Sequence, residues 1–144
     1  AEPGRRPRQG RSGMRITVDT NILIRAVVRD DAEQARRAEQ CLREATVIAV
    51  TLPCLCEFVW VLRRLYRFQP AEISAAIRAL LAVAAVETNR PAVEAGLAML
   101  DAGGDFADGV IAQQGAWLGG STFLSFDQTA VALLTAQGRE AQRP

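Results

Sequence analysis

Five carboxylates occupy positions from which they could act together, each beside a strand-like or helix-like run: Asp19, Glu57, Asp105, Asp108 and Asp127. Crowded carboxylates repel one another and raise one another's pKa, and a divalent cation relieves that repulsion. Mg²⁺ and Mn²⁺ prefer oxygen ligands of this kind. A cation held in this way activates water and binds a phosphate oxygen, so the residue set indicates phosphodiester hydrolysis.

Histidine and lysine are both missing, and their absence excludes several common classes of catalytic and metal site. The 144-residue chain has no histidine, and all 17 of its cationic side chains are arginine, so it also lacks lysine. Catalysis by Ser-His-Asp or Cys-His needs an imidazole. Three cysteines cannot form a four-thiolate zinc site. A P-loop, a Schiff base and a protein kinase each need a lysine.

The surroundings of the acids add to this pattern. Glu57 is the only polar residue of segment 55–62, where a charge is costly to bury unless it is paired or binds a metal. Asp105 and Asp108 are spaced to share one helical face. Asn21 and Ser125 could orient the ligands or a water molecule.

Ordinary structural roles could also explain some of these acids. Asp105 and Asp127 stand where they could cap helices, and Asp108 would favour a helix dipole. Asp19 is the exception, because we expect Thr20 or Asn21 to cap the helix that follows it.

Short apolar runs alternate with helical patterns along the chain. This alternation predicts an α/β fold with a short parallel sheet of four to five strands, covered by helices on both faces. Ligands of such sheets bind outside the carboxyl ends of the strands, where Asp19 and Asp127 lie. The expected strands are 15–19, 46–50, 85–88 and 121–125, and the tail from residue 138 could either add an edge strand or fray. The expected helices are 20–28, 31–44, 53–67, 71–83, 90–101, 106–118 and 128–137.

The charge distribution separates a head from the rest of the chain. Residues 1–15 hold five arginines and one acid, whereas residues 16–144 hold twelve arginines and fifteen acids. We expect residues 1–13 to be a basic disordered leader or the remnant of an expression tag, and 14–144 to form one domain. The cysteines suit a reducing compartment. With no signal peptide and no membrane-spanning apolar run, we expect a cytoplasmic protein.

Four segments together resemble the acidic motifs of a known family. Segments 18–23, 56–62, 105–112 and 123–127 are similar to those of PIN-domain ribonucleases, and most of all to the VapC toxins of bacterial toxin–antitoxin pairs. The resemblance covers Met14 to about Gln137. It implies a three-layer PIN-like sandwich and a Mg²⁺- or Mn²⁺-dependent endoribonuclease. It also implies a homodimer and inhibition by a cognate antitoxin.

The resemblance assigns roles to individual residues. It makes Asp19, Glu57 and Asp108 the core metal ligands and Asp127 the fourth acid. Asp105 matches a position that is often but not always acidic. Asn21 and Ser125 match the polar residues that accompany the first and fourth motifs. Gly109 stands where alanine is commoner, which we expect to loosen its helix.

Some questions stay open from the residues alone. The acid that deprotonates water could be Asp108 or Asp127. Arg25 and Arg29 could hold the RNA backbone or lie on a solvated helix surface. The alanine-rich faces of segments 31–45 and 71–83 could serve a dimer, an antitoxin complex or ordinary core packing.

Two other function classes remain in view. A PIN fold kept as a non-catalytic binding module would be expected to have lost an acid, and none is missing here. A phosphoryl-handling α/β domain would place an aspartate after its first strand, but it would also use the lysine that this chain lacks.

Overall fold

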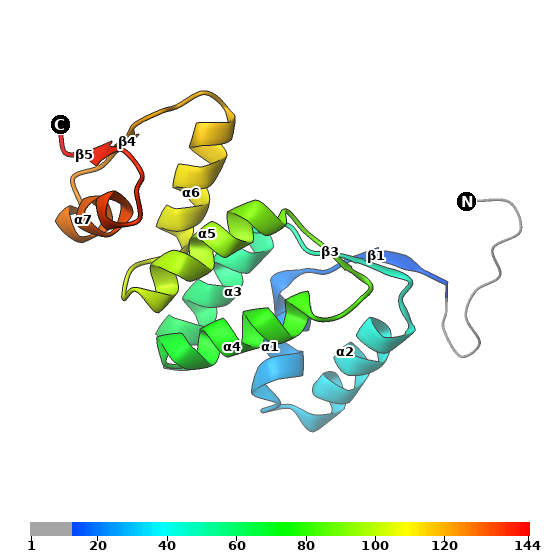
Figure 1. Ribbon diagram of the computed structural model, residues 1–144. Helices are drawn as coiled ribbons and strands as arrows, with labels where there is room; N and C mark the ends of the chain where they lie inside the picture. The colour runs from blue at the N-terminus through cyan, green and yellow to red at the C-terminus, as the bar shows by residue number, and fades with distance from the viewer. Residues whose placement is uncertain (1–12) are drawn as a thin grey trace, which may run out of the picture. The chain divides into compact units, whose positions relative to one another are not determined.

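The computed structural model describes residues 13–144, which fold as strands and helices in alternation (Figure 1). The expected leader falls almost wholly on residues 1–12, outside the described residues. Two compact units can be distinguished. The first is the described part of Ala1–Arg67 together with Ala76–Thr88, and the second is Phe68–Ala75 together with Asn89–Pro144. That residues 14–144 form a single domain stays a prediction.

The first unit is built on a parallel sheet in the order β1-β2-β3. Arg15 pairs with Val47, and Ile48 pairs with Val86, so the three strands are in register along one short segment. Helices connect the strands, as parallel pairing requires. The elements of this unit are β1 Arg15–Thr17, α1 Thr20–Val28, α2 Ala32–Glu44, β2 Val47–Ala49, α3 Leu52–Arg64, the end of α4 Pro70–Leu81 and β3 Val86–Glu87.

Capping residues and apolar stripes explain the helices of this unit. Asp31 caps α2 by accepting a hydrogen bond from the Gln34 N–H at 3.0 Å. Thr51 caps α3, and Pro53 suits its first turn. The predicted stripe of α3 is buried at Leu55, Phe58, Val59 and Leu62. Ala35 and Ala38 of α2 are also buried, so this alanine face serves core packing.

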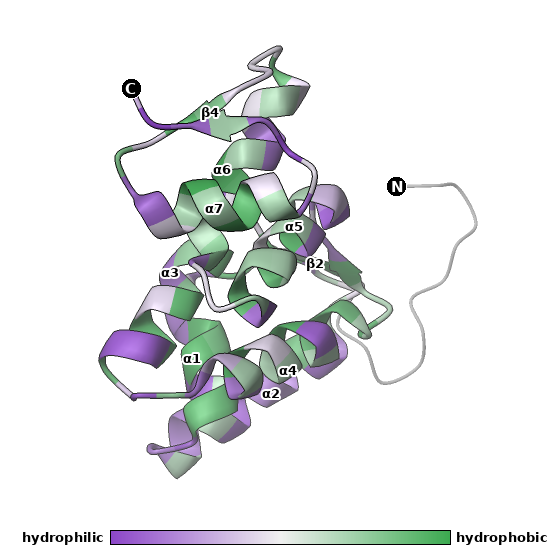
Figure 2. Cartoon of the chain, turned by 60° about the vertical axis from the view of Figure 1, so that its left-hand side comes forward, coloured by the Kyte–Doolittle hydropathy of each residue, from purple (hydrophilic) through white to green (hydrophobic). Residues whose placement is uncertain are grey.

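The second unit is mainly helical and holds a two-stranded parallel sheet. Its elements are the start of α4, α5 Arg90–Asp101, α6 Phe106–Trp117, β4 Phe123–Leu124, α7 Gln128–Ala136 and β5 Ala141–Gln142. Figure 2 shows apolar residues in β4 and in the middle of α7. A buried cluster joins α5, α6 and α7 through Met99, Ala112, Ala130 and Leu134.

The predicted α/β class is confirmed, and every predicted helix and strand is present to within a few residues. One detail differs, because the five strands form a three-stranded and a two-stranded sheet in place of a single one. The reason is that β4 pairs with the C-terminal tail: Phe123 N–H donates to Glu140 O, and Ser125 N–H donates to Gln142 O. Within residues 13–144 no helix has the length and apolar character needed to cross a membrane.

Candidate active site

Asp19 follows β1 and caps α1. Its backbone is extended at φ −80° and ψ 159°, and its Oδ1 accepts the Thr20 N–H at 2.9 Å. Its Oδ2 accepts a hydrogen bond from Asn21 Nδ2 at 3.2 Å. The expectation that Thr20 or Asn21 would be the cap is wrong, because the helix already begins at Thr20. Asn21 instead orients the Asp19 carboxylate from the first turn.

Glu57 lies in α3 among apolar neighbours, yet its side chain is exposed. The expected cost of burying a charge in this apolar segment therefore does not arise. Phe58 and Val59 turn into the core, while Glu57 falls with Trp60 on the exposed side of the helix. An apolar segment does not bury every residue within it, since a helix presents a different face at each position. Glu57 is available to a ligand without any cost of burial.

The Cys54 thiol links the two acids of the first unit. Burial raises the pKa of this thiol, the neighbouring Thr20 side chain lowers it, and the charges of Asp19 and Glu57 raise it further. Both carboxylates thus lie within electrostatic range of one buried side chain. Asp19 and Glu57 therefore both lie near the Cys54 thiol in the first unit.

Two acids of the second unit cap helices, as the sequence allowed. Asp105 caps α6, with Oδ1 accepting the Ala107 N–H at 3.2 Å. Asp127 caps α7 by accepting the Ala130 N–H at 3.1 Å. Ser125 Oγ accepts the Asp127 N–H at 3.0 Å and so holds the backbone that carries this acid. Both carboxylates remain exposed and keep a free oxygen for a further partner.

Asp108 lies in the first turn of α6 and is half-buried. Its pKa is raised above the ordinary 3.8 by burial first, and then by the charges of Asp105 and Asp127. Asp105 and Asp127 therefore lie within electrostatic range of the half-buried Asp108 carboxylate. A cation beside these oxygens would lower the free energy of the ionised form.

Two glycines let α6 approach α5 closely enough to place Asp108. A Cβ at Gly109 would lie 2.2 Å from the Ala95 carbonyl oxygen, and a Cβ at Gly96 would lie 2.6 Å from the Phe106 ring. Gly109 is thus needed for backbone contact between the two helices, a role that its expected loosening of the helix did not include. Gly96 carried only one signal in the sequence, a glycine inside a helical pattern.

The two units thus contribute separate sets of acids. In the first unit Asp19 and Glu57 lie within electrostatic range of Cys54, and in the second unit Asp105 and Asp127 lie within electrostatic range of Asp108. Among residues 13–144, no three acidic or cysteine side chains are arranged so that they could hold a metal ion. The donor set nevertheless fits a hard cation, since it consists of carboxylate oxygens. The four-acid metal site stays a prediction.

The two arginines considered for RNA binding both have acidic partners. Arg25 Nη1 lies 2.9 Å from Asp30 Oδ1, and Arg29 pairs with Glu39. These contacts hold both side chains against the α1–α2 region of the first unit. Their charges are largely balanced, so neither is a strong phosphate ligand by itself.

Comparison with known proteins identifies a family. A family model described as the PIN domain matches residues 16–132, and the matched stretch contains all five acids. No curated protein matches the chain significantly.

Proposed function

Because the chain belongs to the PIN domain family, whose members are generally metal-dependent nucleases, we propose that it is a Mg²⁺- or Mn²⁺-dependent endoribonuclease of the VapC toxin type. The observation that carries this proposal is the set of acids within the matched stretch. Asp108 lies beside two other carboxylates in the second unit, and Asp19 and Glu57 share the surroundings of Cys54 in the first.

Asp19, Glu57, Asp108 and Asp127 would hold the cation, with Asp105 as an additional ligand. When bound, the cation supplies Lewis acidity toward a phosphate oxygen and a more acidic water molecule. Asn21 fixes the orientation of the Asp19 carboxylate, and Ser125 fixes the backbone of Asp127. Such neighbours commonly tune ligand geometry and activity.

Helix capping and metal binding are compatible at these positions. Each capping carboxylate uses one oxygen for a backbone N–H, and its other oxygen can bind a cation, at Asp19 beside the hydrogen bond that this oxygen accepts from Asn21. The cap also fixes the side chain on a helix terminus, so its direction is set before any ligand arrives. Asp19, Asp105 and Asp127 are all held in this way.

The toxin role further predicts partner proteins, namely a cognate antitoxin and a second copy of this chain. Large apolar side chains exposed in the second unit support this part of the proposal. They are Ile111, Trp117, Leu118, Leu124 and Phe126, of which Trp117, Leu118 and Phe126 are each more than 75% exposed. Exposed apolar side chains in such number indicate a surface covered by another protein.

Cleavage of total RNA tests the enzymatic part. We expect the chain to cleave RNA with Mg²⁺ or Mn²⁺ and to lose this activity on addition of a chelator. Cleavage that survives the chelator would contradict metal dependence. RNA left intact under all metal conditions would instead favour a non-catalytic binding module.

Expression in a bacterial host tests the toxin part separately. We expect growth arrest that is relieved by co-expression of the gene encoded beside this one. Active enzyme that does not arrest growth would indicate a nuclease outside toxin–antitoxin systems, and the enzymatic proposal would still stand.

A further inference from the structure

A pocket of about 530 Å³ with a mixed polar and apolar lining opens between α1 and α2 of the first unit. The first helix contributes Asn21, Ile22 and Arg25 to its lining, and the second contributes Gln34, Arg37 and Cys41. Pockets of this size hold small organic ligands or one unit of a polymer. None of the acids predicted to bind metal lines this pocket, so metal binding by these acids does not explain it.

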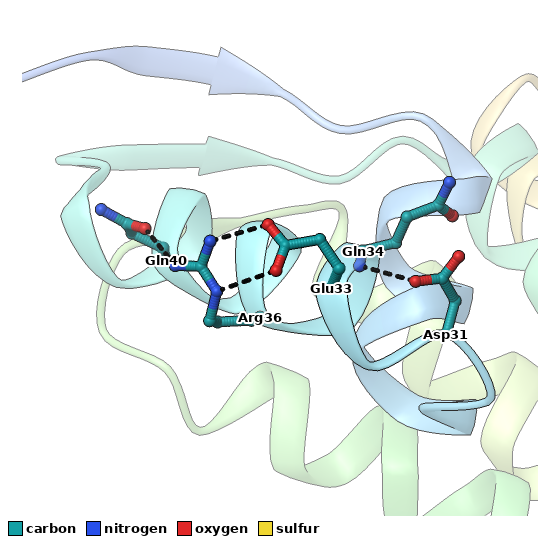
Figure 3. A network of polar contacts seen from close by, with 5 residues as sticks. All are labelled: Asp31, Glu33, Gln34, Arg36 and Gln40. Carbon is teal, nitrogen blue, oxygen red and sulfur yellow. Dashed lines mark hydrogen bonds and ion pairs between the residues drawn. The ribbon is translucent and has the colours of Figure 1, made fainter.

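The spacing of residues along α2 explains why one face lines the pocket. Glu33, Arg36 and Gln40 form a row of polar contacts on the exposed surface, with Arg36 Nη2 at 2.8 Å from Glu33 Oε1 (Figure 3). Each residue of this row is followed in the sequence by a residue that lines the pocket, namely Gln34, Arg37 and Cys41. These three have the i, i+3 and i+7 spacing of a single helical face. In Figure 3 the Gln34 side chain extends away from the Glu33–Arg36–Gln40 row.

The pocket has an excess of positive charge. Arg25 is paired with Asp30, whose hydrogen bond is the main cause that raises the pKa of this arginine. Arg37 forms no ion pair with any residue from 13 to 144. No carboxylate is found among the described lining residues. Glu33 acts on Arg37 through space, but the lining itself is net positive and therefore favours an anionic occupant.

Asn21 connects the pocket with the predicted catalytic acids. Its side chain lines the pocket, and its Nδ2 donates to Asp19 Oδ2 at 3.2 Å. An occupant of the pocket would thus lie next to a carboxylate assigned to the cleavage site. This proximity favours a part of the substrate over an unrelated ligand.

We propose that the pocket binds one nucleotide of the RNA substrate, adjacent to the phosphodiester bond that is cleaved. This inference rests on the proposed nuclease function. Arg37 binds the phosphate or stacks on the base, Ile22 and Ala38 supply an apolar wall, and the carboxamides of Asn21 and Gln34 contact polar edges of the base. Recognition of single-stranded RNA commonly combines arginine stacking with hydrogen bonds to splayed bases.

Binding of a labelled single-stranded RNA oligonucleotide in the presence of a chelator tests the pocket without cleavage. We expect Arg37→Ala to weaken binding about tenfold, as loss of a stacking or phosphate contact would. Arg36→Ala is the matched control, since it removes the same charge from the neighbouring, ion-paired position. Its effect should stay within about twofold. Equal losses in the two variants would overturn the pocket assignment.

Alkylation of Cys41 provides a test that needs no variant. This thiol is free and exposed, whereas Cys54 is buried. We expect bound RNA oligonucleotide to slow the reaction of Cys41 with iodoacetamide several-fold, measured by peptide mass spectrometry. An unchanged rate at saturating RNA would contradict occupancy of the pocket.

The outcomes separate this inference from the nuclease proposal. Loss of RNA binding in Arg37→Ala, together with no cleavage by the parent chain in any metal, would support the pocket and overturn the nuclease. Suppose instead that the parent chain cleaves RNA and that Arg36→Ala and Arg37→Ala lose RNA binding equally. That result would support the nuclease and overturn the pocket assignment. A polyglutamate peptide serves as a second probe: if it protects Cys41 and RNA does not, the pocket binds an acidic protein segment and the RNA assignment is wrong.

Discussion

Gly109 of α6 lies directly against the backbone of Ala95 in α5, where a Cβ would come within 2.2 Å of the Ala95 carbonyl oxygen. Asp108 immediately precedes Gly109 in the chain, so this contact sets the position of the half-buried carboxylate of the second unit. A backbone carbonyl in a helix cannot move aside as the end of a flexible side chain can. The packing of two helices is therefore coupled to the geometry of the candidate site.

Gly109→Ala should destabilise the protein by about 1–3 kcal/mol, because the added methyl group overlaps a backbone atom. The matched control is Gly115→Ala in the same helix, where an added Cβ meets nothing within 4 Å. That variant should be stabilised by about 0.5–1 kcal/mol through helix propensity. Urea unfolding measures the change in the free energy of unfolding for both variants. Equal changes would contradict the conclusion that Gly109 is needed for close packing against Ala95.

Asp19 should have separable capping and catalytic roles. Asn caps a helix about as well as Asp, so Asp19→Asn should leave the free energy of unfolding within about 0.5 kcal/mol, whereas Asp19→Ala should lose about 1 kcal/mol. Both variants should lose RNA cleavage, because both remove the charge. Thermal unfolding and a cleavage assay give the two readouts. Full activity in Asp19→Asn would show that capping is the only role of this acid.

Ser125 should act through Asp127. Removal of the hydroxyl in Ser125→Ala frees the Asp127 N–H and should reduce cleavage about tenfold, in the range known for residues that support metal ligands. Ser121→Ala is the control, since this exposed residue precedes β4 on the same segment. A loss of activity that is equal in the two serine variants would argue against a positioning role for Ser125.

The raised pKa of Asp108 should make stability depend on pH. The folded protein binds this proton more tightly than the unfolded chain does, so the contribution of Asp108 is complete below the ordinary pKa of 3.8 and is lost as pH rises through the raised value. In a chelator at neutral pH, Asp108→Asn should therefore have a higher Tm than the parent chain. Addition of Mg²⁺ should raise the Tm of the parent chain but not the Tm of Asp108→Asn. A Tm lowered by Asp108→Asn under the chelator conditions would contradict the crowding of these acids.

Local patterns predicted most of the secondary structure, because each helix has a cap or a breaker that can be read directly. Asp31, Pro53, Gly103 and Asp105 marked helix ends correctly. A C-terminal strand was one of two alternatives for the tail, and its pairing with β4 was not predicted, since such short strands carry no signal of their partner. Register and partner depend on contacts between distant residues, which a local pattern does not contain.

The site was predicted less completely than the elements that carry it. Carboxylates at strand and helix ends could be found from their spacing, whereas the exposure of Glu57 depends on which face of α3 meets the core. The roles of Gly96 and Gly109 depend on the distance between two helices. Nothing in the sequence indicated that Arg37 differs from Arg36. The two arginines differ in their ion-pair partners, which only the structure shows.

The central claim, metal-dependent RNA hydrolysis by these carboxylates, is tested most directly by a cleavage assay on a defined, end-labelled RNA. The assay compares the parent chain with Asp108→Asn, each with Mg²⁺, Mn²⁺ or a chelator. We predict cleavage by the parent chain only when a metal is present, and a rate at least about 100-fold lower for Asp108→Asn under the same conditions. Comparable rates for the two proteins, or cleavage by the parent chain in the chelator, would contradict metal-dependent hydrolysis by these carboxylates.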